Sequence, residues 1–231
     1  MFPKILFALM LGVAAQAAAL TGFPFASEAL NYSINWPTGL GLGEAHLTAA
    51  HLNGDAWSFE LTLDAAVPGF AVRDDYRAAA TKDLCTNAFS RTFSHGARKS
   101  DENTAVQNGS AKRETVGGGE SDIPVPACVR DALTFLFYTR RELGQGRVPS
   151  SQTILFGSAY RARLDYAGAP MITIGNATAQ ADRLNGTVTS VKNPGASPLH
   201  FEVFFARDAA RTPLLVKVPL AIGTFSMELV R

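Results

Sequence analysis

Regular alternation of apolar and polar residues is the feature of this sequence that most restricts its fold. Between Glu60 and Ala65, and again between Tyr160 and Tyr166, every second position is apolar or aromatic. Successive side chains of a strand point to opposite faces, so this period of two predicts strands with one buried face. Similar runs predict strands at Ala29–Trp36, Glu44–His51, Ala56–Ala65, Ala71–Ala80, Ala88–Ser94, Thr153–Phe156, Met171–Gly175, Gly186–Val191, Leu199–Ala206, Leu214–Val218 and Thr224–Val230.

Turn-forming residues separate several of these runs. Asn and Gly tolerate the positive φ angles of tight turns, and hairpins are predicted at Asn53-Gly54-Asp55, Tyr166-Ala167-Gly168 and Asn185-Gly186. The glycines at 39, 41 and 43 predict a flexible turn or a bulge. Strands joined by two to five residues must pair antiparallel, since parallel pairing needs a longer crossover. The pattern therefore favours an antiparallel meander.

One segment follows the period of a helix. From Pro126 to Leu143 apolar residues recur at intervals of three and four, with Pro126 suited to the first helical position and Gly144 to the position after the end. Phe135 and Tyr138 lie off the main apolar stripe, so the middle of this helix is expected to be buried on several sides. We predict a mainly β fold in which a single open, curved antiparallel sheet, shaped like a half-barrel, wraps this central helix.

The stretch from Lys99 to Asp122 is polar, rich in glycine around Gly117-Gly118-Gly119, and poor in large apolar residues. It predicts a loop or a poorly packed hairpin. No repeat or shift in composition marks a domain boundary, so residues 20–231 are expected to form a single β-rich domain.

Residues 1–19 have the features of a secretory signal peptide. Lys4 precedes an apolar run from Ile5 to Ala15, and small residues follow at the candidate cleavage sites Ala15-Gln16-Ala17 and Ala17-Ala18-Ala19. We expect the remaining chain to be soluble and periplasmic. No cysteine lies near either cleavage site, which argues against a lipoprotein. No later segment reaches the run of about 18 apolar residues that a membrane helix requires.

The charge balance argues against nucleic acid as a partner. The chain has 21 Lys and Arg against 20 Asp and Glu, and loss of Lys4 with the signal peptide leaves it formally neutral. Proteins that bind nucleic acid depend on a concentrated positive charge to neutralise phosphates.

Cys85 and Cys128 are the only cysteines. An even pair in an exported chain predicts a disulfide, and two free buried thiols are the alternative.

No motif for metal binding or nucleophilic catalysis stands out. The four histidines form neither H-x-H nor H-E-x-x-H, so no metal site is expected. The segment around Ser158 lacks the second glycine of a G-x-S-x-G motif. No glycine-rich phosphate loop is present, and no cofactor is expected.

Asp74 and Asp75 are the tightest acidic pair in the chain. Neighbours in a strand face opposite sides, so at most one of them can enter a shared site. We therefore expect a protein that is not an enzyme.

Several segments, taken in order, resemble one bacterial family. They are Leu30-Asn31-Tyr32, Gly41-Leu42-Gly43-Glu44-Ala45, Val72-Arg73-Asp74-Asp75-Tyr76, Asp131-Ala132-Leu133-Thr134-Phe135-Leu136-Phe137-Tyr138 with Arg140, and Pro213-Leu214-Leu215-Val216 followed by Ile222-Gly223-Thr224-Phe225 and Leu229. Their order and spacing resemble the bacterial "domain of unknown function 3108" family over nearly the whole mature chain. The resemblance implies an exported, mostly β envelope protein with no established activity. A similarity to the lipoprotein carriers of the LolA and LolB type is expected at the level of fold, which does not by itself carry function.

A binding function is the first hypothesis. The concavity of the curved sheet is expected to hold a lipid-like or other hydrophobic envelope molecule, with aromatic surface from Phe135, Phe137 and Tyr138 and with Arg140 as an anchor for an anionic head group. A structural or interaction protein of envelope assembly with a closed core is the alternative. A hydrolase with a scattered acidic site is the third hypothesis.

Overall fold

Strands predominate in this computed structural model, which describes residues 27–52, 55–67, 70–220 and 223–230. The predicted signal peptide lies outside the described residues. Within them, the chain forms sixteen strands and one α-helix, α1 (Ala132–Gly144).

The first half of the chain is an antiparallel meander. Each strand pairs with the next one along the chain. The strands are β1 (Glu28–Asn35), β2 (Gly41–Leu52), β3 (Ala56–Val67), β4 (Phe70–Ala80), β5 (Thr86–His95), β6 (Arg98–Gln107), β7 (Ser110–Thr115) and β8 (Gly119–Pro124).

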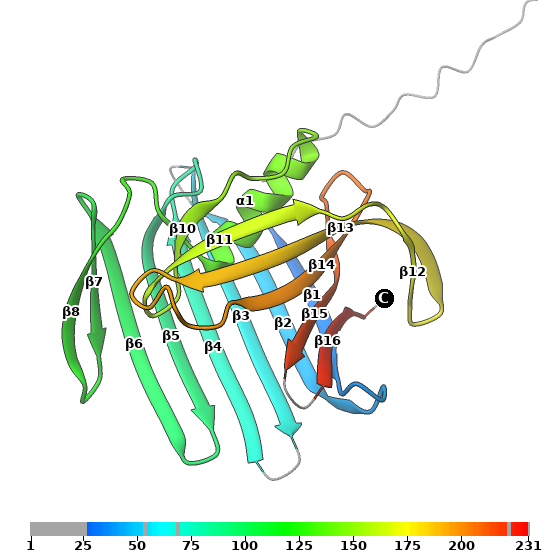
Figure 1. The fold of residues 1–231 in the computed structure, drawn as a ribbon, viewed down its shortest axis with the longest axis horizontal. Helices are drawn as coiled ribbons and strands as arrows, with labels where there is room; N and C mark the ends of the chain where they lie inside the picture. Colours follow the sequence, from blue (N-terminus) through cyan, green and yellow to red (C-terminus); the bar gives the residue numbers. More distant parts are fainter. Residues whose placement is uncertain (1–26, 53–54, 68–69, 221–222, 231) are drawn as a thin grey trace, which may run out of the picture.

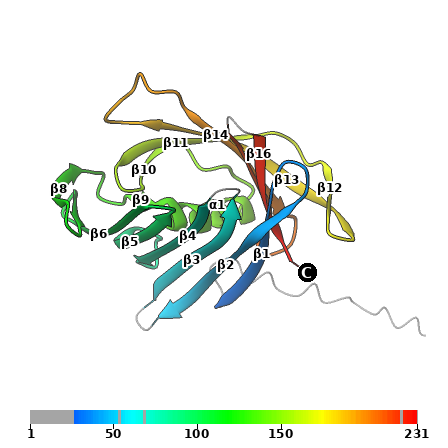
Figure 2. The same ribbon diagram turned by 90° about the horizontal axis from the view of Figure 1, so that it is seen from below.

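The second half continues the same sheet. It contains β9 (Arg130–Asp131), β10 (Gln152–Leu155), β11 (Ala159–Tyr166), β12 (Met171–Ile174), β13 (Ala177–Ser190), β14 (Leu199–Ala206), β15 (Pro213–Leu220) and β16 (Gly223–Leu229). β16 pairs antiparallel with β1, which joins the two halves into one sheet that runs from β8 to β9, and β12 lies off this path and pairs with β13. The sheet bends around α1 without closing into a barrel (Figures 1 and 2). The predicted fold class is confirmed.

The stretch from Lys99 to Asp122 forms hairpins and not a loop, as the second alternative predicts, because it supplies most of β6, β7 and β8 at one end of the sheet, where little apolar surface is buried. Three other local predictions were wrong. No hairpin turn lies at Tyr166-Ala167-Gly168, because β11 pairs with β13 and not with β12. The pair Asn185-Gly186 is not a hairpin turn but the interior of β13. A Cβ on Gly186 would overlap the ring of Phe201, so the glycine gives room to that ring. The third concerns the start of α1.

The helix begins at Ala132 and not at Pro126, because Asp131 caps it. Asp131 has an extended backbone, and its carboxylate accepts the N–H groups of Leu133 and Thr134 at 2.8 and 3.1 Å. The same carboxylate accepts the hydroxyl groups of Thr86 and Thr134, both at 2.6 Å. Thr86 is the first residue of β5, so the cap also fixes the start of the helix to the sheet.

The predicted disulfide between Cys85 and Cys128 is present, with the two Cα atoms 4.8 Å apart. It lies next to the cap, since the N–H of Thr86 also bonds to the carbonyl of Val129 at 2.9 Å. The disulfide and the cap together hold the segment before α1 against the start of β5.

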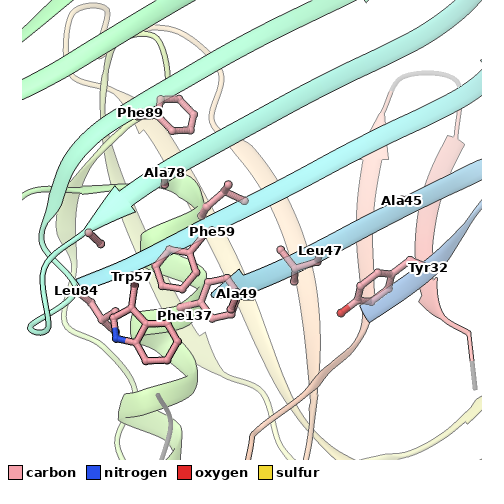
Figure 3. Close-up of a cluster of buried hydrophobic side chains, with 12 residues drawn as sticks. Tyr32, Ala45, Leu47, Ala49, Trp57, Phe59, Ala78, Leu84, Phe89 and Phe137 are labelled. Carbon is pink, nitrogen blue, oxygen red and sulfur yellow. The ribbon is translucent and has the colours of Figure 1, made fainter. Parts of the chain in front are cut away.

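The helix is buried between the two halves of the sheet, as its sequence predicts. Phe137 is fully buried and stacks on Phe59 of β3 with ring centroids 4.0 Å apart (Figure 3). Phe135 belongs to a second cluster with residues of β11, β13 and β14. Only a sheet that bends around the helix buries both aromatic side chains. No helix in the described part of the chain is long and apolar enough to span a membrane.

Candidate functional site

The sheet has an inner face, which is turned toward α1, and an outer face on the opposite side. The ends of β3 to β6 that are distant from α1 extend past the helix (Figure 1). Among the half-buried apolar or aromatic side chains of the inner face, we group four of β3 to β5 with Phe156, which follows β10. We call these five the inner-face patch: Leu61, Leu63, Tyr76, Phe93 and Phe156.

Strand register brings the patch together. Leu61 pairs with Tyr76, while Leu63 pairs with Asp74, which pairs in turn with Phe93. Phe156 directly follows β10, and its ring centroid lies 5.4 Å from that of Tyr76. Because side chains alternate along each strand, the patch residues of β3, β4 and β5 share a face with the core residues Phe59 and Phe89.

Arg91 is the cation within this patch. It is the strand neighbour of Tyr76, and its guanidinium carbon lies 4.9 Å from the ring centroid of Phe156 and 5.2 Å from that of Phe93. Such cation–π contacts are stronger where water is partly excluded, and the side chain of Arg91 is only 18% exposed. Its Nη2 donates to Glu102 at 2.7 Å.

The group around Arg91 retains unused hydrogen-bonding capacity. The Nε atoms of Arg91 and Arg113 and the Oε2 atom of Glu102 are buried and have no hydrogen-bond partner among the residues that the structure describes. Arg113 donates to the carbonyl of Gly157, which has a positive φ and lies so close that a Cβ there would overlap Arg91 and Glu102. Buried polar groups without partners are rare in proteins, and a ligand or a water molecule is one way to satisfy them.

Asp74 forms a second polar group at the distant end of the patch. Its carboxylate lies 2.7 Å from Nε2 of His95 and accepts the hydroxyl of Tyr76 at 2.8 Å. Burial, with the Asp74 charge and hydrogen bond, raises the pKa of Tyr76 well above its usual range, so this hydroxyl stays protonated and donates to Asp74.

The acidic pair divides between the two faces, as alternation predicts. Asp75 lies on the outer face, where Arg77 contacts both Asp75 at 2.9 Å and Glu60 at 3.0 Å. Asp74 is held by His95 and Tyr76 on the inner face. No group of three or more His, Cys, Asp or Glu side chains suited to a metal ion occurs among the described residues.

The predicted aromatic ligand residues are parts of the core or lie against arginines. Phe135 and Phe137 are buried in separate apolar clusters. Tyr138 is half-buried, with the guanidinium groups of Arg130 and Arg141 lying 3.6 and 5.1 Å from its ring centroid. The structure therefore does not gather these three rings on one open surface, and their role in ligand binding stays a prediction.

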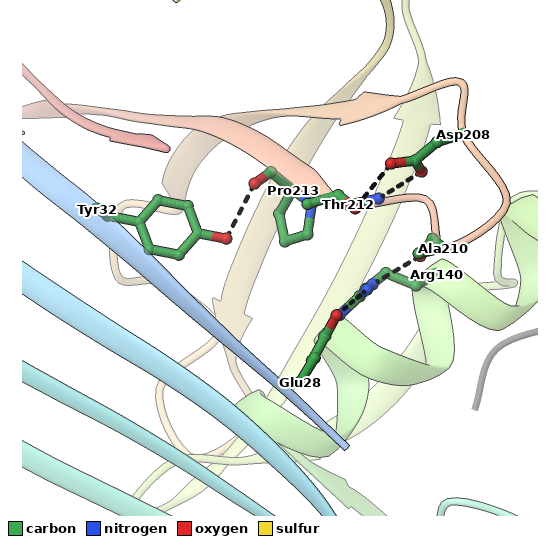
Figure 4. A network of polar contacts seen from close by, with 7 residues as sticks. All are labelled: Glu28, Tyr32, Arg140, Asp208, Ala210, Thr212 and Pro213. Carbon is green, nitrogen blue, oxygen red and sulfur yellow. Dashed lines mark hydrogen bonds and ion pairs between the residues drawn. The ribbon is translucent and has the colours of Figure 1, made fainter. Parts of the chain in front are cut away.

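Arg140 is fully buried and bound within the protein (Figure 4). Its Nη1 and Nη2 atoms both donate to the carboxylate of Glu28, at 3.0 Å for Nη2, and its Nε donates to the carbonyl of Ala210 at 3.0 Å. Glu28 opens β1, so this ion pair ties the helix to the strand that joins the sheet halves. To anchor a ligand, Arg140 would have to exchange Glu28 for the ligand's anionic group.

Sequence reasoning missed Arg91 and Phe156. Arg91 looks like any polar residue of a strand, and Phe156 like any apolar end of a strand. The contact between Arg91 and Phe156 depends on how the turn after β10 packs against β4 and β5. No local sequence pattern predicts that packing. The alternation in β5 contained one weak signal, because it places Arg91 on the same face as the buried Phe89.

Comparisons with known proteins agree with this architecture. Residues 31–230 match the model of the family described as "Protein of unknown function (DUF3108)". No curated protein matches the sequence significantly. The fold is similar to the crystal structure of a beta-barrel-like protein of domain of unknown function DUF1849 from Brucella abortus, with a TM-score of 0.64, 6% identity, and coverage of 89% of this chain and 96% of that one. At this identity the likeness concerns the fold alone.

Proposed function

The chain belongs to the DUF3108 family, and we propose that it binds a lipid-like molecule with an anionic group on the inner-face patch. The observation that carries this proposal is the set of half-buried apolar side chains on the inner face with a partly shielded arginine among them. Ligand sites are commonly apolar surfaces with a few polar groups that fix orientation.

The patch and Arg91 would have different roles. The side chains of Leu61, Leu63 and Phe93 offer apolar contact to a hydrocarbon chain, with a gain of about 25 cal/mol for each Å² removed from water. Arg91 has five N–H donors, of which Glu102 is seen to take one, so its other donors are available to a carboxylate or phosphate. Both arginines face a carboxylate, but Arg140 uses three of its N–H groups on Glu28 and Ala210, whereas Arg91 uses one on Glu102. Arg91 therefore replaces Arg140 as the proposed anchor.

We further propose that the protein is exported to the periplasm and is not an enzyme. The disulfide between Cys85 and Cys128 supports an oxidising compartment, because such bonds are rare in the cytosol. The hydrolase hypothesis required a cleft that gathers Asp74 or Asp75 with a second carboxylate. Asp74 instead bonds to His95 and Tyr76, and the second carboxylate near Asp75 shares an exposed arginine with it.

A matched pair of fluorescent probes tests the proposal. Dansyl-undecanoate carries a hydrocarbon chain and a carboxylate, whereas its methyl ester lacks the charge. We expect the acid to bind more tightly than the ester, and Phe93→Ser to weaken both about tenfold, equivalent to about 1.4 kcal/mol. Met171→Ser, which removes an exposed apolar side chain on β12, is the control and should change neither affinity.

The role of Arg91 needs a variant that leaves no buried charge behind. Arg91→Gln alone would strand Glu102, so Arg91→Gln is combined with Glu102→Gln, which removes both charges and keeps a polar pair. This double variant should bind the acid and the ester equally. Equal binding in the wild type, or insensitivity to Phe93→Ser, would refute the site. Absence of probe binding and of any co-purified lipid in native mass spectrometry would favour the structural alternative.

A further inference from the structure

The outer face of the sheet contains a groove of about 860 Å³ that runs across β3 to β8. Phe89 points into the core, so its neighbours Ala88 and Ser90 point outward and form part of the floor. Ala79 and Ala105 are strand neighbours of Ala88 on the same face. Because these side chains on adjacent strands are small, the floor of the groove lies close to the backbone of the sheet.

One end of the groove, formed by β7 and β8, carries unbalanced charge. Glu114 lies directly opposite Glu120, and Lys112 lies opposite Asp122. All four residues line the groove and are exposed. No ion pair involves Lys112, Glu114 or Glu120 within the described part of the chain. Like charges directly opposite each other on paired strands are destabilising, and a cation between Glu114 and Glu120 would relieve them.

The outer edge of β8 offers backbone groups beside these charges. β8 is the last strand of the sheet among the described residues. Val125 donates its N–H toward the β7 side, to Gly109 at 2.9 Å. Because direction alternates along a strand, the N–H and carbonyl groups of Glu120 and Asp122 point away from β7. Pro124 also points its carbonyl outward, and it brings no N–H to the edge.

We propose that this edge and the acidic end of the groove bind an extended segment of a partner protein with lysine or arginine at alternate positions. The segment adds as an antiparallel strand to β8 and places its basic side chains beside Glu114, Glu120 and Asp122. Charge selects this partner over a second copy of the chain, because two β8 strands paired together would bring glutamate and aspartate side chains into contact. Such strand addition is a common mode of peptide recognition.

A synthetic ten-residue peptide of alternating lysine and threonine is the probe, and a peptide of alternating glutamate and threonine is its control. Fluorescence anisotropy at low salt should show binding of the lysine peptide alone. Asp122→Asn and Asp122→Pro both remove one charge, but only proline removes the outward N–H. We expect Asp122→Pro to weaken binding at least tenfold more than Asp122→Asn does, and Glu120→Lys to abolish it.

Amide hydrogen exchange provides a second readout that does not depend on a variant. The lysine peptide should slow exchange at Glu120 and Asp122 in the wild-type protein and leave the outer-face residue Asp101 unchanged. The proposal is overturned if the two peptides bind equally, if Asp122→Pro and Asp122→Asn behave alike, if neither amide is protected, or if sedimentation shows a dimer that Asp122→Pro dissociates. Loss of dansyl-undecanoate binding would not affect it, because that probe addresses the opposite face.

Discussion

The cap of α1 allows one prediction to be worked out from individual hydrogen bonds. The carboxylate of Asp131 accepts two backbone N–H groups and the hydroxyl groups of Thr86 and Thr134. Asp131→Ala removes the acceptor and leaves these donors in a buried site. Loss of a helix cap costs about 1 kcal/mol, and each of the two hydroxyl bonds contributes about 1 kcal/mol. We therefore expect the free energy of unfolding to fall by about 3 kcal/mol.

For a chain of this length, 3 kcal/mol corresponds to a fall in Tm of roughly 6 to 12 °C. Urea unfolding followed by tryptophan fluorescence measures the loss directly. Asp131→Asn is the matched variant, because its carboxamide oxygen can still accept the N–H groups of Leu133 and Thr134. It should lose only about 1 kcal/mol near neutral pH. Equal losses in the two variants would mean that the cap does not act through these hydrogen bonds.

The pH dependence of the free energy of unfolding provides an independent test of the Asp131 cap, because its direction can be predicted. Burial raises the pKa of Asp131 above 3.8, against the opposing effect of its hydrogen bonds. A raised pKa in the folded state means that stability is fully present below pH 3.8 and falls as the pH rises through the folded value. The carboxamide introduced by Asp131→Asn does not titrate. The stability of the wild type relative to Asp131→Asn should therefore decrease as the pH rises from 3.8 toward neutral pH. An increase over that range would refute the reasoning.

Three further predictions concern stability. Replacing both Cys85 and Cys128 with serine should lower the free energy of unfolding by roughly 4 kcal/mol, the chain-entropy value for a separation of 43 residues, in urea titrations against the oxidised wild type. Phe137→Ala should cost about 3 to 5 kcal/mol by opening a cavity against β3, whereas an unchanged midpoint would show that the core collapses to fill it. Gly43→Ala should lower Tm, since its Cβ would lie 2.0 Å from the backbone carbonyl oxygen of Asp64. An unchanged Tm would show that β2 can shift to make room for the methyl group.

Local pattern predicted most of the strands, and the errors have identifiable causes. The stretch from Lys99 to Asp122 was predicted only as a loop or a poorly packed hairpin, because this end of the sheet buries little apolar surface and its sequence lacks an apolar stripe. The start of α1 was placed too early because Pro126 fits a first helical turn, whereas the cap at Asp131 depends on Thr86, which lies far away in the sequence.

The candidate site was less predictable than the fold. Periodicity identified a buried helix with excess aromatic surface, but it did not reveal that Glu28, 112 residues away, neutralises Arg140. Nor did it reveal that Arg91 lies between Phe93 and Phe156. The sequence around a charged residue can look the same whether its side chain faces solvent or a partner far away in the chain. The choice between Arg91 and Arg140 therefore required the folded structure.

The amino-acid sequence determined the elements themselves: strands with one apolar face, one helix apolar on several sides, and two cysteines available for a bond. These depend on spacing between near neighbours, which the chain carries directly. Only the tertiary structure decided that β1 pairs with β16 and which side chains lie beside Arg91. Such contacts join residues far apart in the sequence, and their register depends on the packing of all the intervening strands at once.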